Sequence, residues 1–362
     1  MAQRSIVDIE AAADALPPDA RARFDRIYRA AVYETELRAP AEMVPWIERT
    51  FGSLAAVRRQ RIVRVDNLVT GEGALFNSLR ALRPVQAAPD GAGADDVARA
   101  LEDDPWADPY TATPEDAFGR LQSAHGVTAA NVARYDGAHS LVIFNEADPL
   151  AFDDAALAAH LELAQRWFER VWQEDPSACY PFLMWNCLWR AGGSIVHGHM
   201  QAAVARGGHY AKIERLRADA ERYRAAHGAS YFDDLFDVHR ALGLRFAGAD
   251  GLEGAAHLTP LKEKELIFRL PVPFAAAAAP LSRALRRYVD ALGARSFNLA
   301  LLLPPLAPAP EAWDGFPPLA RLVDRGPLGS RTSDIGGMEL YAQSVAASDP
   351  FAVAAEMARA FA

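Results

Sequence analysis

The chain has 362 residues, 51% hydrophobic and 23% charged, a composition typical of a soluble globular protein of one large or two medium domains. Its net charge of −9 argues against a general nucleic-acid-binding protein, so an anionic substrate needs a local cluster of donors. The two cysteines, Cys179 and Cys187, form neither a disulfide framework nor a Cys-x-x-Cys zinc site. Because neither a secretion signal nor an apolar run of membrane-spanning length is apparent, a cytoplasmic protein without a membrane partner is expected.

The first 60 residues are expected to form a helical N-terminal extension. Ser5 and Asp8 can cap a first helix, and Pro18 can start a second that runs to about residue 30. Arginines alternate with apolar residues over 58–65, which predicts a strand that enters the main fold.

The segment 70–84 contains glycines together with Asn77, Arg80 and Arg83. Two interpretations stay open for it. One is a surface helix that ends at Pro84. The other is a substrate-binding segment in which Asn77, Arg80 and Arg83 contact a phosphate or sugar phosphate, the two arginines through forked donors.

Two loops and one helix are predicted next. Residues 85–100 are rich in alanine, glycine and aspartate and predict a loop, and 103–114 predict a second loop against the active domain. A helix capped by Asp153 or Asp154 is expected to run to about residue 171, with apolar residues spaced for one buried face.

Residues 131–144 have the form strand, turn, strand, with Asp136-Gly137 as the hairpin signal. Asn131, Arg134 and His139 are candidate substrate contacts, although an ordinary hairpin residue is the favoured interpretation for each of them alone.

The stretch 186–203 is the one around which the chain is organised. Alternate side chains of a strand share a face, so His197, His199 and Gln201 are expected to project together. The upstream segment 192–194, Gly-Gly-Ser, lets backbone and a small hydroxyl approach a ligand closely. Two imidazoles and an amide suit a phosphate group, because one nitrogen can attack it while other donors hold its oxygens.

Three interpretations compete for these side chains. In the first, the two histidines are structural and hydrogen-bond to their neighbours. This interpretation is disfavoured, because three polar groups on one apolar strand are costly to bury unless they have a function. Zinc binding has a good start in His-x-His, but Gln201 is a poor third ligand and no cysteine pair is nearby. A nucleophilic histidine in phosphoryl or nucleotidyl transfer is favoured, with no metal and no cofactor.

The pattern resembles the transferase branch of the histidine-triad (HIT) superfamily, in which glutamine replaces the third histidine. Asn186 lies thirteen residues before His199, and Gly193 and Ser194 are also in the superfamily register. The resemblance implies that His199 is the nucleophile, that His197, Gln201 and Ser194 assist, and that Asn186 and Gly193 contact the substrate. Galactose-1-phosphate uridylyltransferases share this pattern; they often carry a Cys-x-x-Cys pair for a structural metal, which this chain lacks.

The same resemblance implies an α+β fold of two HIT-like halves, each an antiparallel sheet backed by helices. Residues 1–60 would be the extension, 61–209 the catalytic half, and 210–362 a linker helix (210–227) and a degenerate half without a second His-x-His. The repeat is expected as strands at 265–270 and 297–303 separated by a helix at 279–293.

Two tail segments, 316–321 and 335–339, resemble the sugar-holding tail of the uridylyltransferases, which places Arg321 near the acceptor. A lysine and a tyrosine of that tail are absent here, where Thr332 and Gly337 stand.

Galactose-1-phosphate uridylyltransferase-like transfer of a nucleoside monophosphate, from a sugar nucleotide to a phosphate-bearing acceptor, is therefore the expected function. A dinucleoside-polyphosphate or sugar-nucleotide phosphorylase or hydrolase remains an alternative, as does a nucleotide-binding protein without turnover. The nucleobase and a homodimeric state are left open.

Overall fold

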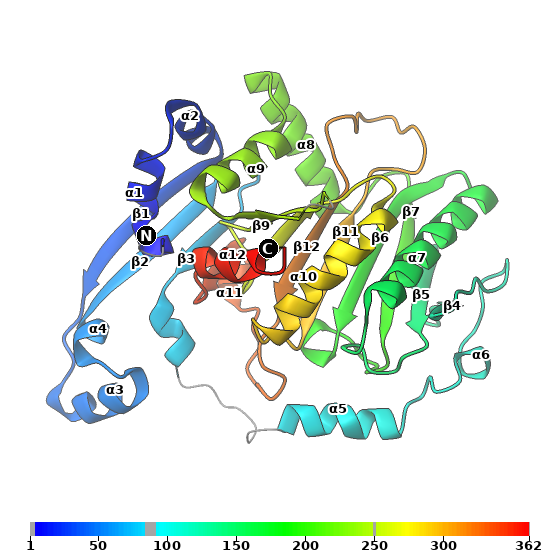
Figure 1. Ribbon diagram of the computed structural model, residues 1–362, viewed down its shortest axis with the longest axis horizontal. Helices are drawn as coiled ribbons and strands as arrows, with labels where there is room; N and C mark the ends of the chain where they lie inside the picture. The colour runs from blue at the N-terminus through cyan, green and yellow to red at the C-terminus, as the bar shows by residue number, and fades with distance from the viewer. Residues whose placement is uncertain (1–3, 84–91, 249–250, 362) are drawn as a thin grey trace.

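The computed structural model describes residues 4–83, 92–248 and 251–361 (Figure 1). Its main feature is a nine-stranded sheet in which all neighbouring strands run antiparallel. In spatial order its strands are β4 (Gly126–Ala130), β5 (Ala138–Phe144), β7 (His199–Arg206), β6 (Ala178–Cys187), β11 (Phe297–Leu302), β12 (Leu319–Asp324), β10 (Leu266–Arg269), β9 (Glu253–Ala256) and β8 (Arg245–Ala247).

The sheet is built from two halves with mirrored order. The order β4-β5-β7-β6 from the first half is followed by β11-β12-β10-β9 from the second, and β6 pairs with β11 where the halves meet. Each half carries a long helix before its central strands: α7 (Asp154–Glu174) and α10 (Ala278–Asp290). These helices pack against one another on one face of the sheet (Figure 1). The α+β class and the doubled layout expected from the sequence are confirmed, with both halves contributing to one continuous sheet.

Because side chains alternate along each strand, the large sheet has one face covered by helices and one opposite face. Val142 and Phe144 of β5 belong to the main core with α7, whereas Leu141 and Ile143 pack in a separate cluster beside Trp106. The opposite face carries the polar residues described below. A helix-covered sheet therefore leaves its other face to bind ligands.

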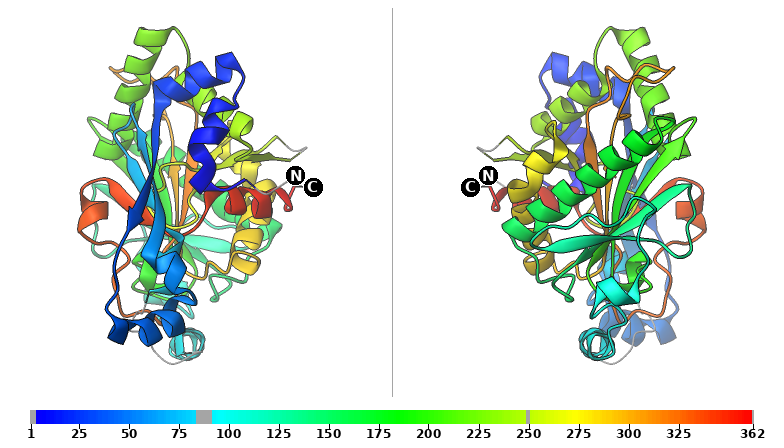
Figure 2. Two further views of the ribbon diagram at one scale, coloured as in Figure 1. Left: turned by 90° about the vertical axis from the view of Figure 1, so that its left-hand side faces the viewer. Right: turned by 90° about the vertical axis from the view of Figure 1, so that its right-hand side faces the viewer.

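A second, four-stranded sheet lies beside the first. Its strands are, in order, β1 (Tyr28–Glu36), β2 (Arg59–Asn67), β3 (Gly73–Phe76) and β13 (Gln343–Ala346). The pair β3–β13 is parallel and brings the C-terminal region to the N-terminal one. Figure 2 shows the long β1–β2 ribbon along one side of the molecule.

The N-terminal region contains the expected helices, but the prediction that it is helical throughout is wrong at β1. Residues 28–36 pair along their whole length with β2, and most of their side chains are half-buried or exposed. Because neither face of β1 is deeply buried beyond Tyr28, its sequence has no clear apolar alternation. The pairing partner also lies some thirty residues away, beyond the range of a local pattern.

Two further local predictions are corrected. Residues 92–100 of the predicted 85–100 loop belong to helix α5, which continues to Glu102; Val97 and Leu101 lie one turn apart on it and both line one cavity. Residues 84–91 lie outside the described residues. The hairpin strand expected at 131–135 lies earlier, at β4, so residues 131–137 form the connecting loop.

The other described α-helices are α1 (Ile9–Asp14), α2 (Pro18–Ile27), α3 (Val44–Phe51), α4 (Leu54–Arg58), α5 (Ala92–Glu102), α6 (Pro109–Ala112), α8 (Ala211–His227), α9 (Tyr231–Leu242), α11 (Gly337–Leu340) and α12 (Pro350–Ala358). Short 3-10 turns occur at η1 (Ile6–Asp8), η2 (Ala41–Met43), η3 (Ser78–Leu82), η4 (Trp189–Ala191) and η5 (Phe274–Ala277). Among the described residues, no helix combines the length and apolar character needed to cross a bilayer.

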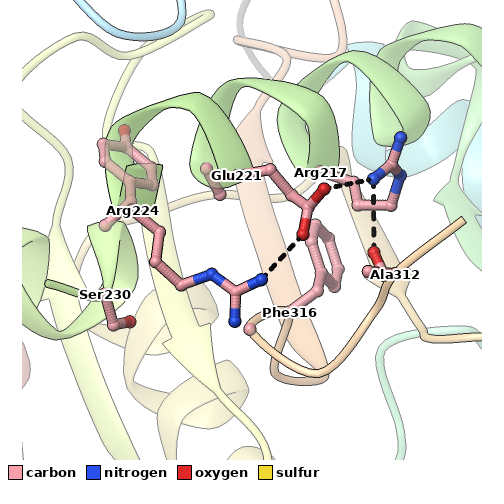
Figure 3. Close-up of a pocket in the computed structure, with 9 residues that line it drawn as sticks. Arg217, Glu221, Arg224, Ser230, Ala312 and Phe316 are labelled. Carbon is pink, nitrogen blue, oxygen red and sulfur yellow. Dashed lines mark hydrogen bonds and ion pairs between the residues drawn. The ribbon is translucent and has the colours of Figure 1, made fainter. Parts of the chain in front are cut away.

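A seam of charged residues fastens α8 to the long loop that precedes β12. Arg217 and Arg224 both contact Glu221, and Arg217 also donates to the carbonyl of Ala312 at 3.2 Å (Figure 3). The cavity between them has a volume of about 20 Å³, room for roughly one water molecule. This seam is a structural contact that leaves no space for a substrate.

Two fully buried histidines, His239 and His257, make the fold sensitive to acid. Burial lowers the pKa of both to about 3, assisted for His257 by the charge of Arg321. In the unfolded chain the two histidines titrate near pH ~6.5. Between pH ~6.5 and about 3, each histidine is therefore protonated in the unfolded chain but neutral in the folded chain. The free energy of unfolding is therefore not reduced by these histidines above pH ~6.5. Below that pH it falls by about 1.4 kcal/mol per pH unit for each histidine.

Urea unfolding at pH 7, 6 and 5 measures this effect. His239→Leu keeps the site apolar, so it should reduce the slope of unfolding free energy against pH by about 1.4 kcal/mol per unit. The exposed His227 is the matched control, and His227→Leu should leave the slope unchanged. An equal slope in His239→Leu and the unmodified protein would contradict the assignment.

Candidate active site

His199 and Gln201 occupy the start of β7 and point away from the helix-covered face. Gln201 lies opposite Met184 of β6, which lies opposite Ala300 of β11, which in turn lies opposite Arg321 of β12. Directly opposed residues of antiparallel strands share a face. One row of side chains therefore runs across both halves, and its ends are about 14 Å apart, three strand spacings of about 4.8 Å.

The hydrogen bonding of His199 selects its reactive nitrogen. Nδ1 of His199 lies 2.8 Å from the carbonyl oxygen of His197, and a carbonyl can only accept, so Nδ1 carries the proton. Nε2 then keeps its lone pair and has no hydrogen-bond partner among the described residues. The ring is 6% exposed, and burial lowers the pKa of His199. The result is a neutral imidazole with one unprotonated nitrogen directed away from its own backbone.

His197 is bound on both ring nitrogens. Nδ1 lies 2.6 Å from a carboxylate oxygen of Asp104, and Nε2 lies 2.8 Å from the carbonyl oxygen of Phe144. Both partners are acceptors, so both nitrogens donate and the ring is an imidazolium paired with Asp104. The sequence predicted that His197 would face the phosphate beside His199. These contacts instead leave it no lone pair and direct its protons toward the protein.

Asp104 and Trp106 are site residues that the sequence analysis did not single out. The Asp104 side chain is 6% exposed, and the Trp106 ring lies edge-on to His199 with 5.0 Å between ring centroids. Both belong to the segment predicted as a loop against the active domain. The sequence of this loop includes Asp-Asp-Pro-Trp, and a tryptophan and carboxylates among turn residues are the feature that could have indicated functional side chains there.

Two glycines make the local backbone path feasible. A Cβ on Gly198 would lie 2.4 Å from the Phe144 ring, and one on Gly193 would lie 2.7 Å from the carbonyl oxygen of Asn186. The close approach at Gly198 seats both histidines against β5, and that at Gly193 folds the loop back onto β6.

Gln201 is oriented by the loop between β4 and β5. Tyr135 donates its backbone N–H to Nδ1 of His139 at 3.5 Å, so Nε2 of His139 carries the proton and donates to Oε1 of Gln201 at 3.2 Å. The Tyr135 hydroxyl also reaches Oε1 at 3.4 Å. The NH₂ group of Gln201 is thereby left to donate elsewhere, with no partner among the described residues. Asn131 lies 3.4 Å from His139, which puts this predicted contact in the same group.

Asn186 links the two halves of the sheet. Its side-chain oxygen accepts from Asn298, directly opposite on β11, at 2.8 Å, and Asn298 also donates to the carbonyl of Ala191 at 2.8 Å. Arg325 in turn donates to Asn298 at 2.6 Å and pairs with Asp334. The remaining NH₂ of Asn186 touches only the sulfur of Met184, at 3.9 Å, and remains available to a ligand.

The other predicted residues are less closely tied to His199. Ser194 is exposed in the loop before β7 and makes no side-chain hydrogen bond with the described residues. Asn77 caps η3 by accepting from Leu79 at 3.1 Å and donates to Gln60 at 2.9 Å, which are contacts of a structural cap. Arg80 and Arg83 are exposed and line a cavity of about 650 Å³ with Lys262 and Glu339 among its walls.

A second cavity, of about 360 Å³, lies over the second half of the sheet face. Arg321 and the predicted segment Ile335–Glu339 both contribute to its wall. That this cavity belongs to the acceptor half of the site stays a prediction. No group of three His, Cys, Asp or Glu side chains within the described ranges is placed to hold a metal ion.

No protein-family model matches the sequence, and no curated protein matches it. Several solved structures do match the fold. An ADP-glucose phosphorylase from Arabidopsis thaliana with bound ADP-glucose has a TM-score of 0.60 at 15% identity, over 80% of this chain and 96% of that chain. A galt-like protein from Arabidopsis thaliana has a TM-score of 0.58 at 14% identity, over 69% and 89% of the two chains. A uridylyltransferase has a TM-score of 0.56 at 13% identity, over 69% and 88%. The chain shares its fold with these proteins, and the fold implied by the histidine-triad resemblance is confirmed.

Proposed function

We propose that the protein is a nucleotidyltransferase that forms a nucleotidyl-histidine on Nε2 of His199. The observation that carries this proposal is the assignment of protons at the two histidines. His199 has an unprotonated, unpartnered nitrogen, and His197 has none. Geometry therefore supports His199, the same residue that the superfamily register implies.

The reaction proceeds through two displacements at one phosphorus. Nε2 of His199 attacks the α-phosphorus of a nucleotide donor, a P–N bond forms, and the P–O bond to the distal phosphate group breaks. An oxygen of the acceptor phosphate then attacks the same phosphorus, the P–N bond breaks, and Nε2 regains its lone pair. The NH₂ of Gln201 is oriented to donate to a phosphoryl oxygen, and the nearby His197 imidazolium favours the developing negative charge.

Sugar-nucleotide chemistry is supported by the uridylyltransferase resemblance and by the solved ADP-glucose phosphorylase and uridylyltransferase that share the fold. A phosphorylase, in which inorganic phosphate is the acceptor, uses the same covalent step and is the second candidate. The amide of Gln201 can donate a hydrogen bond but cannot act as a general acid, which suits a phosphate leaving group because such a group departs without protonation.

Covalent labelling tests the proposal. The protein is incubated with a panel of sugar nucleotides, nucleoside triphosphates and dinucleoside polyphosphates, without an acceptor, and the peptide 191–206 released by cleavage at Arg190 and Arg206 is weighed. One nucleoside monophosphate, labile to acid as a phosphoramidate is, should be added. Hexose 1-phosphate, inorganic phosphate and water are then compared as acceptors. Tight nucleotide binding without any adduct would instead identify a binding protein without turnover.

The pH dependence of labelling follows from the buried position of His199. Burial lowers its pKa, so the ring stays neutral below pH ~6.5, where an exposed histidine is half protonated. Protonation removes the attacking lone pair. The rate of adduct formation should therefore hold steady from pH 8 to 6.5 and decline only at lower pH. A midpoint at or above pH 6.5 would contradict the buried, neutral nucleophile.

A further inference from the structure

Asp116, which lies between α6 and β4, is a buried carboxylate that binds donors from three segments. Its side chain is 7% exposed, and both of its oxygens accept hydrogen bonds. Oδ2 accepts from the Ser140 hydroxyl at 2.6 Å and from the indole N–H of Trp167 at 2.8 Å. Oδ1 accepts from Nη2 of Arg134 at 2.8 Å. One carboxylate therefore joins α7, β5 and the loop 131–137 between β4 and β5.

Two of these three donors are the sequence neighbours of the residues that orient Gln201. Arg134 directly precedes Tyr135, whose hydroxyl lies 3.4 Å from Oε1 of Gln201. Ser140 directly follows His139, whose Nε2 donates to the same oxygen at 3.2 Å. The carboxylate therefore fixes the backbone from which both orienting side chains extend.

Strand β5 separates this carboxylate from the substrate. Side chains alternate along the strand, so Ser140 and His139 point to opposite faces of the sheet. Ser140 lies on the face covered by α7, where Trp167 is buried, and His139 lies on the face of Gln201. Asp116 holds the strand from the covered side, whereas the reacting phosphate meets the opposite side. Asp116 can therefore act on the transfer only through the residues that it binds.

The strengths of the contacts show which of them fix the loop. The two contacts to Oε1 of Gln201, at 3.2 and 3.4 Å, are long for hydrogen bonds, and Tyr135 itself is exposed. The contacts of Asp116, at 2.6 to 2.8 Å, are short, and hydrogen bonds to an ionised group are roughly twice as strong as neutral ones. On the other side of Tyr135, Asp136 accepts from the Tyr210 hydroxyl at 2.6 Å. Strong contacts at both neighbours of Tyr135 thus hold the weaker contacts at Gln201 in place.

We infer that Asp116 is a positioning residue for the nucleotidyl transfer, and that it acts through Arg134 and Ser140 on the side-chain amide of Gln201. The inference rests on the proposed function and adds to it the residue that fixes the donor to the phosphoryl oxygen. With the loop fixed, Oε1 of Gln201 stays bound and its NH₂ group faces the phosphate before charge develops. Without the anchor the amide turns freely and presents Oε1, an acceptor that repels a phosphoryl oxygen.

Arg134→Ala tests the inference without disturbing the core. Arg134 is 40% exposed, and the other two donors still satisfy the carboxylate in this variant. Labelling of His199 at saturating donor should slow by about 10- to 100-fold, the scale for a small misplacement of a group at the reacting centre. Arg134→Lys keeps a cation for Asp116 and should recover most of the rate.

The matched control is Arg240→Ala on α9, which removes an exposed ion pair with Asp237 of 2.6 Å. It should label at the unmodified rate. An unmodified rate in Arg134→Ala as well would overturn the inference.

A double-mutant cycle with Gln201→Ala separates positioning from direct contact, because the sequence also made Arg134 a candidate substrate contact. Gln201→Ala alone should slow labelling by about 10²- to 10³-fold, the scale for losing one donor to a developing charge. Since Arg134 acts through Gln201, adding Arg134→Ala should slow labelling by no more than about twofold further. Full slowing by Arg134→Ala in both backgrounds would overturn the inference and leave the nucleotidyltransferase proposal intact.

The orientation of Gln201 is also measured without any reaction, so that failure of labelling counts against the proposed function alone. In protein carrying ¹⁵N in its glutamine side chains, each NH₂ group gives a pair of nuclear magnetic resonance signals, and the pair missing from Gln201→Ala identifies Gln201. This pair should shift or broaden in Arg134→Ala and stay in place in Arg240→Ala. Unchanged Gln201 signals in Arg134→Ala would overturn the inference on their own.

Discussion

Replacement of His199 by alanine should abolish the nucleotidyl adduct on the peptide 191–206 with every donor. The variant lacks the only ring nitrogen of the His-x-His pair that keeps a lone pair, because both nitrogens of His197 donate to acceptors. His197→Ala should still form the adduct, more slowly by about 10² to 10³, the scale for losing one positioned group that stabilises developing charge.

The matched control for both variants is His227→Ala at the exposed end of α8, which should label at the unmodified rate. Mass spectrometry of the quenched protein gives both rate and stoichiometry, and melting curves confirm that each variant is folded. An adduct that persists in His199→Ala and disappears in His197→Ala would reverse the assignment of the nucleophile.

The strand that carries the site was predictable because its pattern is local. His199 and Gln201 share a face by simple alternation, and the structure places both on the sheet face away from α7 and α10. Asn186 lies on the neighbouring strand β6, and Gly193 lies in the loop between β6 and β7; their contact with a substrate stays a prediction. Local spacing sufficed because all of these residues lie within one strand–loop–strand segment.

The partners of these residues were not predictable in the same way. Asp104 reaches His197 across 93 positions of sequence, and the orientation of Gln201 is set by His139 and Tyr135, more than sixty positions away. Side-chain hydrogen bonds over such distances depend on the register of strand pairs and the path of loops. A repeating pattern in the sequence specifies neither the register nor the loop path. The sequence therefore predicted that His197 faces the phosphate, and it did not indicate Asp104.

The tail shows an intermediate case. The resemblance grouped Arg321 with 335–339, and both do line one cavity. The sequence carried no sign that Arg321 is held between Glu265 and Glu72, which immediately precede strands of two different sheets. That pairing makes the expected acceptor contact Arg321 a buried residue whose charge is compensated and whose Nη2 has no hydrogen bond.

Asp104→Ala should lower both stability and the labelling rate, because it removes one partner of a buried ion pair. The two side chains are 4% and 6% exposed, so the Nδ1–H of His197 would remain buried without an acceptor. Breaking such a pair costs about 3–5 kcal/mol, which urea unfolding at pH 7.5 can measure. Asp103→Ala, at the exposed neighbouring carboxylate, is the matched control and should stay within about 0.5 kcal/mol of the unmodified protein.

Asp104→Asn separates the role of charge from that of shape. The amide oxygen can still accept from Nδ1 of His197, so most of the stability lost in Asp104→Ala should return. The negative charge that faces Nδ1 of His197 is absent in this variant, however. If the charge of the Asp104–His197 pair supports the phosphate, Asp104→Asn should be folded yet slow in labelling. A folded Asp104→Asn that labels at the unmodified rate at every pH would show that Asp104 holds the ring in place without contributing to the transfer.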